Sequence, residues 1–227
     1  MRNFTAYGPS HWAVLALFVL GAVLLIAFRD RLAGQGFRRA FALAVLALQL
    51  AIQVYSLFHF GLDNALPLQL SDLAGYATVY ALWSLRHWAF SLTYYWGLTL
   101  STQALFSPAL GGADFPSIGF LAFWLIHLMV IWSAIYLTVV HRLRPTWRGY
   151  RRTVLVTLCW VASMLVFNAI AGTNYGFLNE KPAVHSILDI LGPWPWYLLP
   201  EIALVLAVWA LMTVALSARA DRGVSWD

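Results

Sequence analysis

Ionisable side chains stand inside strongly apolar stretches of this sequence. His127 lies in the run FWLIHLMVIW, and a histidine can serve as a general base near neutral pH. The alternative is a neutral imidazole that hydrogen-bonds between helices. Glu201 directly follows Pro200, where a carboxylate could orient a histidine, pair with a basic residue or cap a helix. Because ionisable groups in an apolar setting are costly, we expect His127 and Glu201 to belong to a functional site.

Ser71 and Asp72 form a second candidate pair, in the stretch ALPLQLSDLAGY. Serine followed by aspartate is a good helix N-cap, so the pair could simply start a helix. A helix from Asp72 to Leu85 would have only about 14 residues, which is short for a bilayer span. We therefore expect the helix to begin at Leu66, with Pro67 in its first turn and Ser71 facing a cavity. Both interpretations stay open for Ser71, and the structural one is slightly favoured for Asp72.

The elements that position these residues are membrane helices. Of the 227 residues, 62% are hydrophobic and 10% are charged, whereas a soluble domain is about half apolar and about a quarter charged. This composition excludes a water-soluble globule. The single cysteine, Cys159, excludes a disulfide framework, and no HExxH or CxxC spacing occurs. The sequence predicts an all-α, multi-pass membrane protein, and we expect no metal, no cofactor and no nucleic-acid partner.

Seven segments are long and apolar enough to be transmembrane helices. They cover residues 11–28, 38–60, 66–85, 88–107, 117–140, 152–171 and 196–217, within one membrane domain over residues 1–227. The connection from Gly172 to Pro195 is longer than a helical hairpin needs. We expect it to contain a short helix around residues 185–191 that packs over the outer face.

The arginines predict the orientation of these segments. Apart from Arg2, which precedes the first segment, they follow the first, third, fifth and seventh segments: Arg29, Arg31, Arg38, Arg39; Arg86; Arg142, Arg144, Arg148, Arg151, Arg152; Arg219 and Arg222. By the positive-inside rule, the N-terminus is outside and the C-terminus is cytoplasmic. The preference for arginine over lysine hints at a bacterial source, so we expect the bacterial inner membrane.

With this orientation, polar side chains gather at the outer ends of the segments. Gln69, Gln103 and Asn168 lie in the segments, and Asn174, Tyr175 and Lys181 lie in the long outer connection. A cavity open to the outer side would satisfy these groups, which makes them candidate substrate-binding residues. For the three residues of the connection a solvated loop is the alternative, although Lys181, the only lysine, could attract an anionic headgroup.

Four stretches resemble a known family. LPLQLSDLAGY, LTLSTQALFSPALG, FWLIH and NYGFLNEKP with SILDILGPWPWYLL look like the bacterial YwaF family, which is related to the eukaryotic transmembrane protein 164 family of membrane acyltransferases. The resemblance implies a seven-helix fold and an enzyme that acts on lipid acyl esters. It also implies that Ser71 and His127 occupy the positions of the proposed nucleophile and base. The family typically has cysteine at the first position, where this sequence has serine.

The resemblance gives a concrete hypothesis, an acyltransferase or hydrolase with membrane lipids as partners and a lipid or acyl chain as substrate. Ser71 would attack an acyl carbonyl, His127 would take its proton, and Glu201 or Asp72 would orient the imidazole. Asn168, Asn174 or Gln69 would donate hydrogen bonds to the oxyanion. The alternative is a transporter or receptor that binds a small polar or lipidic ligand without covalent chemistry. A third possibility is an assembly protein whose polar residues only hold helices together.

Overall fold

The computed structural model of the protein describes residues 2–182 and 187–221. The α-helices are α1 (Pro9–Ala27), α2 (Gln35–His59), α3 (Leu62–Ala65), α4 (Leu70–Ser84), α5 (His87–Trp96), α6 (Thr102–Phe106), α7 (Ile118–Val139), α8 (Trp147–Ala171) and α9 (Leu198–Asp221). A π-helix, η1 (Gly97–Ser101), joins α5 to α6, and two 3₁₀ helices, η2 (Tyr175–Phe177) and η3 (Ile187–Leu191), lie between α8 and α9. Within the described residues there is no strand beyond an isolated bridge of Asn3 with Ala113, which confirms the all-α prediction.

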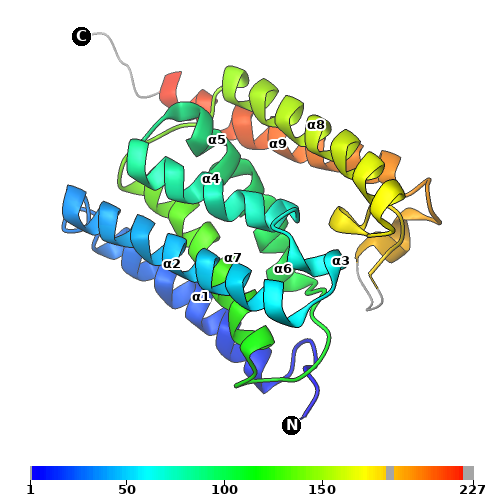
Figure 1. The fold of residues 1–227 in the computed structure, drawn as a ribbon. Coiled ribbons are helices and arrows are strands. Elements are labelled where there is room, and N and C mark those ends of the chain that lie inside the picture. The colour runs from blue at the N-terminus through cyan, green and yellow to red at the C-terminus, as the bar shows by residue number, and fades with distance from the viewer. Residues whose placement is uncertain (1, 183–186, 222–227) are drawn as a thin grey trace.

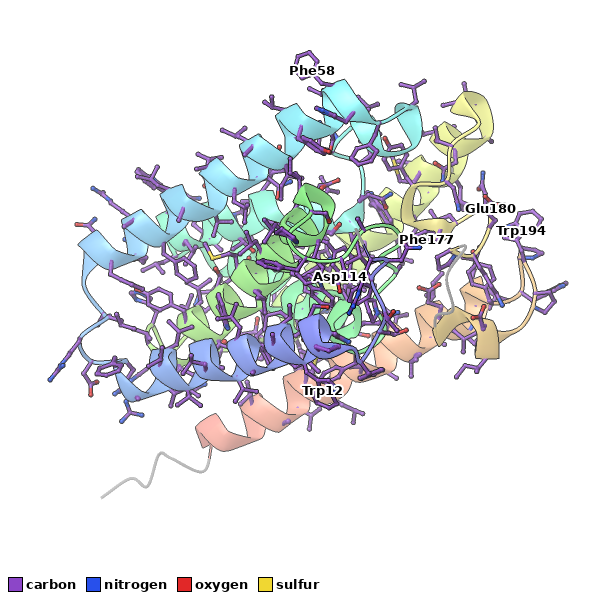
Figure 2. All side chains as sticks on the ribbon, turned by 90° about the horizontal axis from the view of Figure 1, so that it is seen from below. Trp12, Phe58, Asp114, Phe177, Glu180 and Trp194 are labelled. Atoms are coloured by element: carbon purple, nitrogen blue, oxygen red, sulfur yellow. The ribbon has the colours of Figure 1, made fainter. Side chains whose placement is uncertain are left out.

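The outer surface of the bundle is apolar, as in a membrane protein. Five of the described helices are long and apolar enough to cross a membrane: α1, α2, α7, α8, and α9 over Leu198–Leu216. Large side chains on them face outward, such as Phe58 with 81% and Ile170 with 82% exposure. Figure 2 shows Phe58 and Trp12 projecting away from the bundle. The protein is therefore a multi-pass membrane protein, since such a surface needs lipid around it.

Helices α4, α5 and α7 form the centre of the bundle. In Figure 1, α4, α5 and α7 lie between α1 and α2 on one side and α8 and α9 on the other. All side chains of α5 from Ala89 to Trp96 are buried, because α4, α7 and α8 pack against this helix. Helix α4 has only 15 residues, and α5 only 10 before the π-helix begins. The seven-span count therefore stays a prediction.

Helix α4 begins later than the sequence predicted. It starts at Leu70, and the predicted start at Leu66 is wrong. The reason is a capping box, in which an Asp72 carboxylate oxygen accepts a hydrogen bond of 3.1 Å from the N–H of the N-cap residue, Gln69. Pro67 lies in the link between α3 and α4. The cap places Ser71 at the second position of the helix.

Buried polar side chains tie distant helices together. Arg38 of α2 donates hydrogen bonds of 2.5 Å and 2.7 Å to the carbonyls of Leu82 and Trp83 at the end of α4. Because the last carbonyls of a helix lack partners within it, the guanidinium satisfies groups that would otherwise be unpaired. His11 of α1 lies 2.8 Å from the Leu105 carbonyl of α6. Part of the polar content of the bundle is therefore purely structural.

The connection between α8 and α9 is folded over the end of the bundle. The short helix η3 covers the second part of the predicted helix near residues 185–191, and His185 lies outside the described residues. The sequence did not predict η2. Tyr197, just before α9, donates a hydrogen bond to the Phe177 carbonyl of η2. Burial raises the pKa of Tyr197 to about 12, and the carboxylates of Glu201 and Glu180 add to the rise. The hydroxyl therefore keeps its proton and holds η2 beside α9.

Candidate functional site

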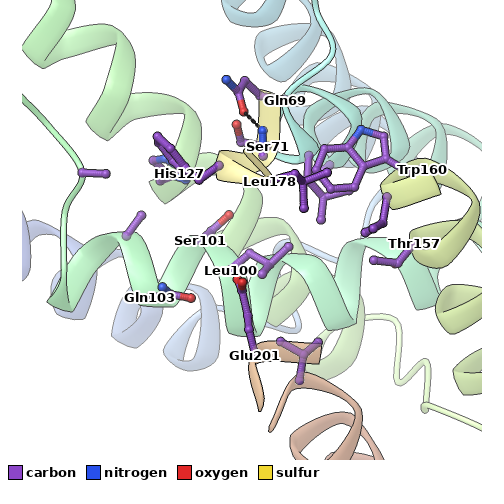
Figure 3. A pocket seen from close by; sticks show the side chains of 18 of the residues that line it. Gln69, Ser71, Leu100, Ser101, Gln103, His127, Thr157, Trp160, Leu178 and Glu201 are labelled. Atoms are coloured by element: carbon purple, nitrogen blue, oxygen red, sulfur yellow. Dashed lines mark hydrogen bonds between the residues drawn. The ribbon is translucent and has the colours of Figure 1, made fainter. Parts of the chain in front are cut away.

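A cavity of about 450 Å³ lies among α4, the run from η1 to α6, α7, α8 and α9, and η2 covers part of it. This volume is in the range of small-molecule sites. Its polar lining consists of Gln69, Ser71, Ser101, Gln103, Ser107, His127, Thr157 and Glu201, and the rest is mainly apolar. Figure 3 shows most of these side chains around the cavity. The structure thus brings together Gln69, Ser71, Gln103, His127 and Glu201 from the predicted site.

Ser71 and His127 line the same cavity from different helices. Ser71 lies in the first turn of α4, and the buried His127 lies in the middle of α7. The His127 ring packs edge-on against Phe123, with 4.6 Å between the ring centroids. Neither the Ser71 hydroxyl nor the His127 ring nitrogens form a hydrogen bond, with each other or with any other described residue. Both groups are therefore available to a ligand.

Glu201 faces the cavity from the first turn of α9. Figure 3 shows its side chain pointing toward Leu100 on the opposite wall. In the part of the chain that the structure describes, this carboxylate makes neither a hydrogen bond nor an ion pair. Among the described residues no three His, Cys, Asp or Glu side chains come together as a metal site, so the carboxylate faces the cavity without such a cluster.

Two glutamines add hydrogen-bonding groups to the same cavity. The Gln69 Oε1 atom accepts a hydrogen bond of 3.0 Å from the backbone N–H of Gly176, drawn as a dashed line in Figure 3. This bond joins the cap of α4 to η2 and turns the glutamine toward the cavity. Gln103 lies in α6 and also lines the cavity. The amide N–H groups of both residues are candidate donors to a ligand oxygen.

Asp72 lies outside the cavity lining and has a structural role. One carboxylate oxygen caps the N–H of Gln69, and the other accepts a hydrogen bond of 3.4 Å from Gln49 Nε2 in α2. The side chain therefore anchors the first turn of α4 to α2. The structural interpretation favoured from the sequence describes this position well, and Asp72 acts on the site through Gln69 and Ser71.

The other predicted binding residues hold the connection between α8 and α9 and do not line the cavity. Asn168 donates a hydrogen bond of 3.0 Å to the Tyr175 carbonyl and accepts one of 2.9 Å from the Tyr175 N–H. The Tyr175 hydroxyl in turn accepts from the Leu66 N–H and donates to the Leu62 carbonyl. Asn174 caps the N–H groups of Asn179 and Glu180, while Lys181 pairs with Asp189 at 3.9 Å and lies over the Tyr197 ring. The backbone N–H and C=O groups of a loop need hydrogen-bond partners, and most of these side chains supply them. The four residues therefore stabilise the fold of this connection.

Ser101 is a cavity residue that the sequence interpretation missed. It is buried, lines the cavity and lies at the end of the π-helix η1. Its hydroxyl forms no hydrogen bond within residues 2–182 and 187–221. π-Helical turns occur frequently at functional sites, but they have no simple sequence signature. Thr157, by contrast, uses its hydroxyl in bonds of 2.8 Å to the Thr153 carbonyl and 2.9 Å from Trp96 Nε1.

Comparison with known proteins supports the resemblance drawn from the sequence. The model of the TMEM164 family matches residues 6–213, which include every polar residue of the cavity. YwaF-like proteins are bacterial relatives of that family, so the predicted resemblance is confirmed. No curated protein and no solved structure matches the chain. Because the match extends over most of its length, the chain belongs to the TMEM164 family.

Proposed function

We propose that the protein is a membrane-embedded enzyme that transfers or hydrolyses acyl esters of lipids. The observation that supports this best is the convergence of Ser71, His127 and Glu201 on one cavity, each without a hydrogen-bond partner among the described residues. Polar groups left unpaired in an apolar lining cost free energy unless a ligand satisfies them. A hydroxyl, an imidazole and a carboxylate are the set that acyl transfer through a serine ester requires.

The proposed reaction has two steps. Ser71 Oγ attacks the acyl carbonyl carbon while a ring nitrogen of His127 takes the hydroxyl proton. The tetrahedral intermediate collapses, the original ester bond breaks, and the leaving alcohol oxygen receives the proton from His127. A second hydroxyl, from an acceptor lipid or from water, then attacks the acyl-serine, and His127 relays its proton back to Ser71. Gln69 and Ser101 are our proposed donors to the oxyanion.

Ser71 and His127 must approach each other when the substrate binds. Hydrogen bonds between nucleophile and base are often long or absent in empty sites and tighten in the substrate complex. Glu201 is our proposed orienting carboxylate, because it faces the cavity and Asp72 is already engaged in the cap of α4. Asn168 and Asn174, which the sequence also offered as oxyanion donors, are engaged in the outer connection.

We further propose that the enzyme crosses the bacterial inner membrane seven times and takes membrane lipids as its substrates. In this arrangement α4 and the continuous run from α5 to α6 are the two additional spans beside the five long apolar helices. The N-terminus faces outward and the C-terminus faces the cytoplasm. The arginines after α1 and before α8 then lie on the cytoplasmic side, and the cavity opens near the outer leaflet.

A second candidate function is non-covalent binding of a lipid by a receptor or transporter. The lack of a hydrogen bond between Ser71 and His127 favours it, because a binding site needs no nucleophile and base in contact. The two candidates differ in one respect that can be measured, which is whether an ester bond of the lipid is broken.

The test is acyl exchange by the purified protein in phosphatidylcholine vesicles that contain an isotope-labelled lysolipid. We expect Ser71→Ala and His127→Ala to abolish formation of labelled diacyl lipid, and Ser71→Cys to preserve or raise it, since a thiol is partly ionised at neutral pH. Ser163→Ala and His59→Ala are matched controls, because both residues are exposed and outside the cavity lining. Full activity of Ser71→Ala would exclude the enzyme mechanism and favour lipid binding.

A further inference from the structure

The cavity has two chemically distinct parts. Its polar part holds the candidate catalytic groups. Its other part, the apolar lobe, is formed by Val154 and Leu158 of α8 and by Val205, Leu206 and Trp209 of α9. Thr157 lies beside the lobe, but its hydroxyl is engaged in two hydrogen bonds. An apolar lobe next to unpaired polar groups suits a single hydrocarbon chain that ends in a carbonyl group.

We infer that Trp209 closes the deep end of the apolar lobe and limits the length of the acyl chain that the enzyme accepts. This inference rests on the proposed function. Along α9 the cavity is lined by Leu198, Glu201, Ile202, Val205, Leu206 and finally Trp209. The indole therefore forms the floor on the side away from η2.

The floor is held rigidly in place. Trp209 has 1% exposure, and its Nε1 atom donates a hydrogen bond of 3.0 Å to Thr99 Oγ1 in η1. Its ring packs on Tyr95 with 5.5 Å between centroids. The Tyr95 hydroxyl is itself 2.6 Å from Thr213 Oγ1 on α9. The indole cannot swing aside without breaking this set of contacts, so a longer chain meets a fixed wall.

The depth of the apolar lobe gives an estimate of the chain length. Trp209 lies eight residues after Glu201, which is about 12 Å along a helix. Carbon–carbon bonds of about 1.5 Å advance an extended chain by about 1.25 Å per carbon, so this depth takes about ten carbons. The enzyme thus accepts one chain of roughly ten carbons at a time.

The test is the chain-length profile of acyl exchange, measured with donors from eight to twenty carbons in the vesicle assay. Trp209→Leu opens the floor, and we expect the optimum to move about two to four carbons longer. Leu206→Phe fills the lobe, and we expect the optimum to move shorter. Leu211→Ala is the control, because Leu211 is an exposed residue of the same helix outside the cavity lining, and it should leave the profile unchanged.

Opposite shifts of the preferred chain length in the two variants distinguish the inference from a loss of folding, since a misfolded protein loses activity without changing its chain-length preference. An active enzyme whose profile is the same in wild type, Trp209→Leu and Leu206→Phe would overturn the inference and leave the proposed function intact. A wild type that exchanges no donor would overturn the proposed function. In that case, fatty acids with a photoreactive diazirine at the chain end are crosslinked to the wild type. Labelling of Trp209 or its lobe neighbours retains the chain-binding inference, and labelling elsewhere overturns it.

Discussion

Gln49 of α2 and Gly75 of α4 meet so closely that a Cβ atom on Gly75 would lie 2.2 Å from Gln49 Oε1. Gln49 is fully buried, and its Nε2 atom donates to Asp72 Oδ1. Its Oε1 atom has no hydrogen-bond partner among the described residues. The contact therefore positions the first turns of α4, which carry Ser71, and it depends on the absence of a side chain at position 75.

Gly75→Ala should lower the stability of the protein. The added methyl group overpacks the contact with Gln49, which typically costs about 1–3 kcal/mol. Gln49→Ala in the same chain frees the space and should restore part of the loss. The measurement is thermal unfolding in detergent, followed by tryptophan fluorescence. Gly119→Ala is the control, since nothing lies near its Cβ position. An equal loss in the single and double variants would contradict this account.

Asp72→Ala should reduce stability and activity together. The substitution removes the cap on the Gln69 N–H, an effect of about 1 kcal/mol, and it also releases Gln49 from α4. Asp72→Asn keeps an acceptor for one of these bonds and should be milder. Unfolding temperature and acyl exchange are measured on the same samples. Loss of activity at an unchanged unfolding temperature would instead assign Asp72 a direct role beside His127.

Glu201→Gln should slow the acyl-exchange reaction at saturating donor by roughly 10- to 100-fold while leaving the KM for the donor lipid nearly unchanged, because an orienting carboxylate acts in the transition state. Glutamine keeps the size of the side chain and removes only the charge. Glu180→Gln is the matched control, since Glu180 is exposed and lies outside the cavity lining. A rise in KM at constant kcat would show that Glu201 binds the substrate and does not orient the base.

The proposed orientation predicts which cysteines an impermeant thiol reagent reaches in intact cells. Gly111→Cys, in the exposed connection before α7, should be labelled from outside, whereas Arg148→Cys, exposed in the first turn of α8, should not. Both changes are made in a Cys159→Ser background, because the native cysteine is exposed. The reverse labelling pattern would place the cavity on the cytoplasmic side.

The sequence predicted the helices and part of the site because burying polar groups in an apolar environment costs free energy. Long apolar runs therefore mark the helices, and the few polar residues within them mark the site. His127 and Glu201 stand out in apolar runs, and both line the cavity. Asn174 and Lys181 are equally polar, but in the structure they already have partners. Asn174 accepts a hydrogen bond from the backbone N–H of Glu180, and Lys181 pairs with Asp189. Composition alone cannot separate a group that waits for a ligand from one that already has a partner.

The start of α4 and the place of Ser101 in the cavity lining could not be predicted, for a different reason. A helix could start at Leu66 with Pro67 in its first turn, or after the N-cap Gln69 with Asp72 three residues later. The tertiary contact from Gln49 to Asp72 favours the second start. The π-helix before Ser101 has no local signature of this kind. It packs against α7, which is distant in the sequence, so the sequence around the π-helix does not reveal this contact.

The π-helix has a consequence for how this site can evolve. Each residue of an α-helix advances the chain by about 100°, so one extra residue turns everything after it by about that angle. The side chains from Ala89 to Trp96 are buried in the core, whereas Ser101 and Gln103, which line the cavity, lie at the end of the π-helix or after it. A one-codon deletion in this turn would rotate a different set of side chains into the cavity and keep the register of the core residues before Gly97, although the buried Leu105 of α6 would rotate as well. A descendant could therefore exchange one wall of the site in a single genetic event, without any substitution at the residues that form it.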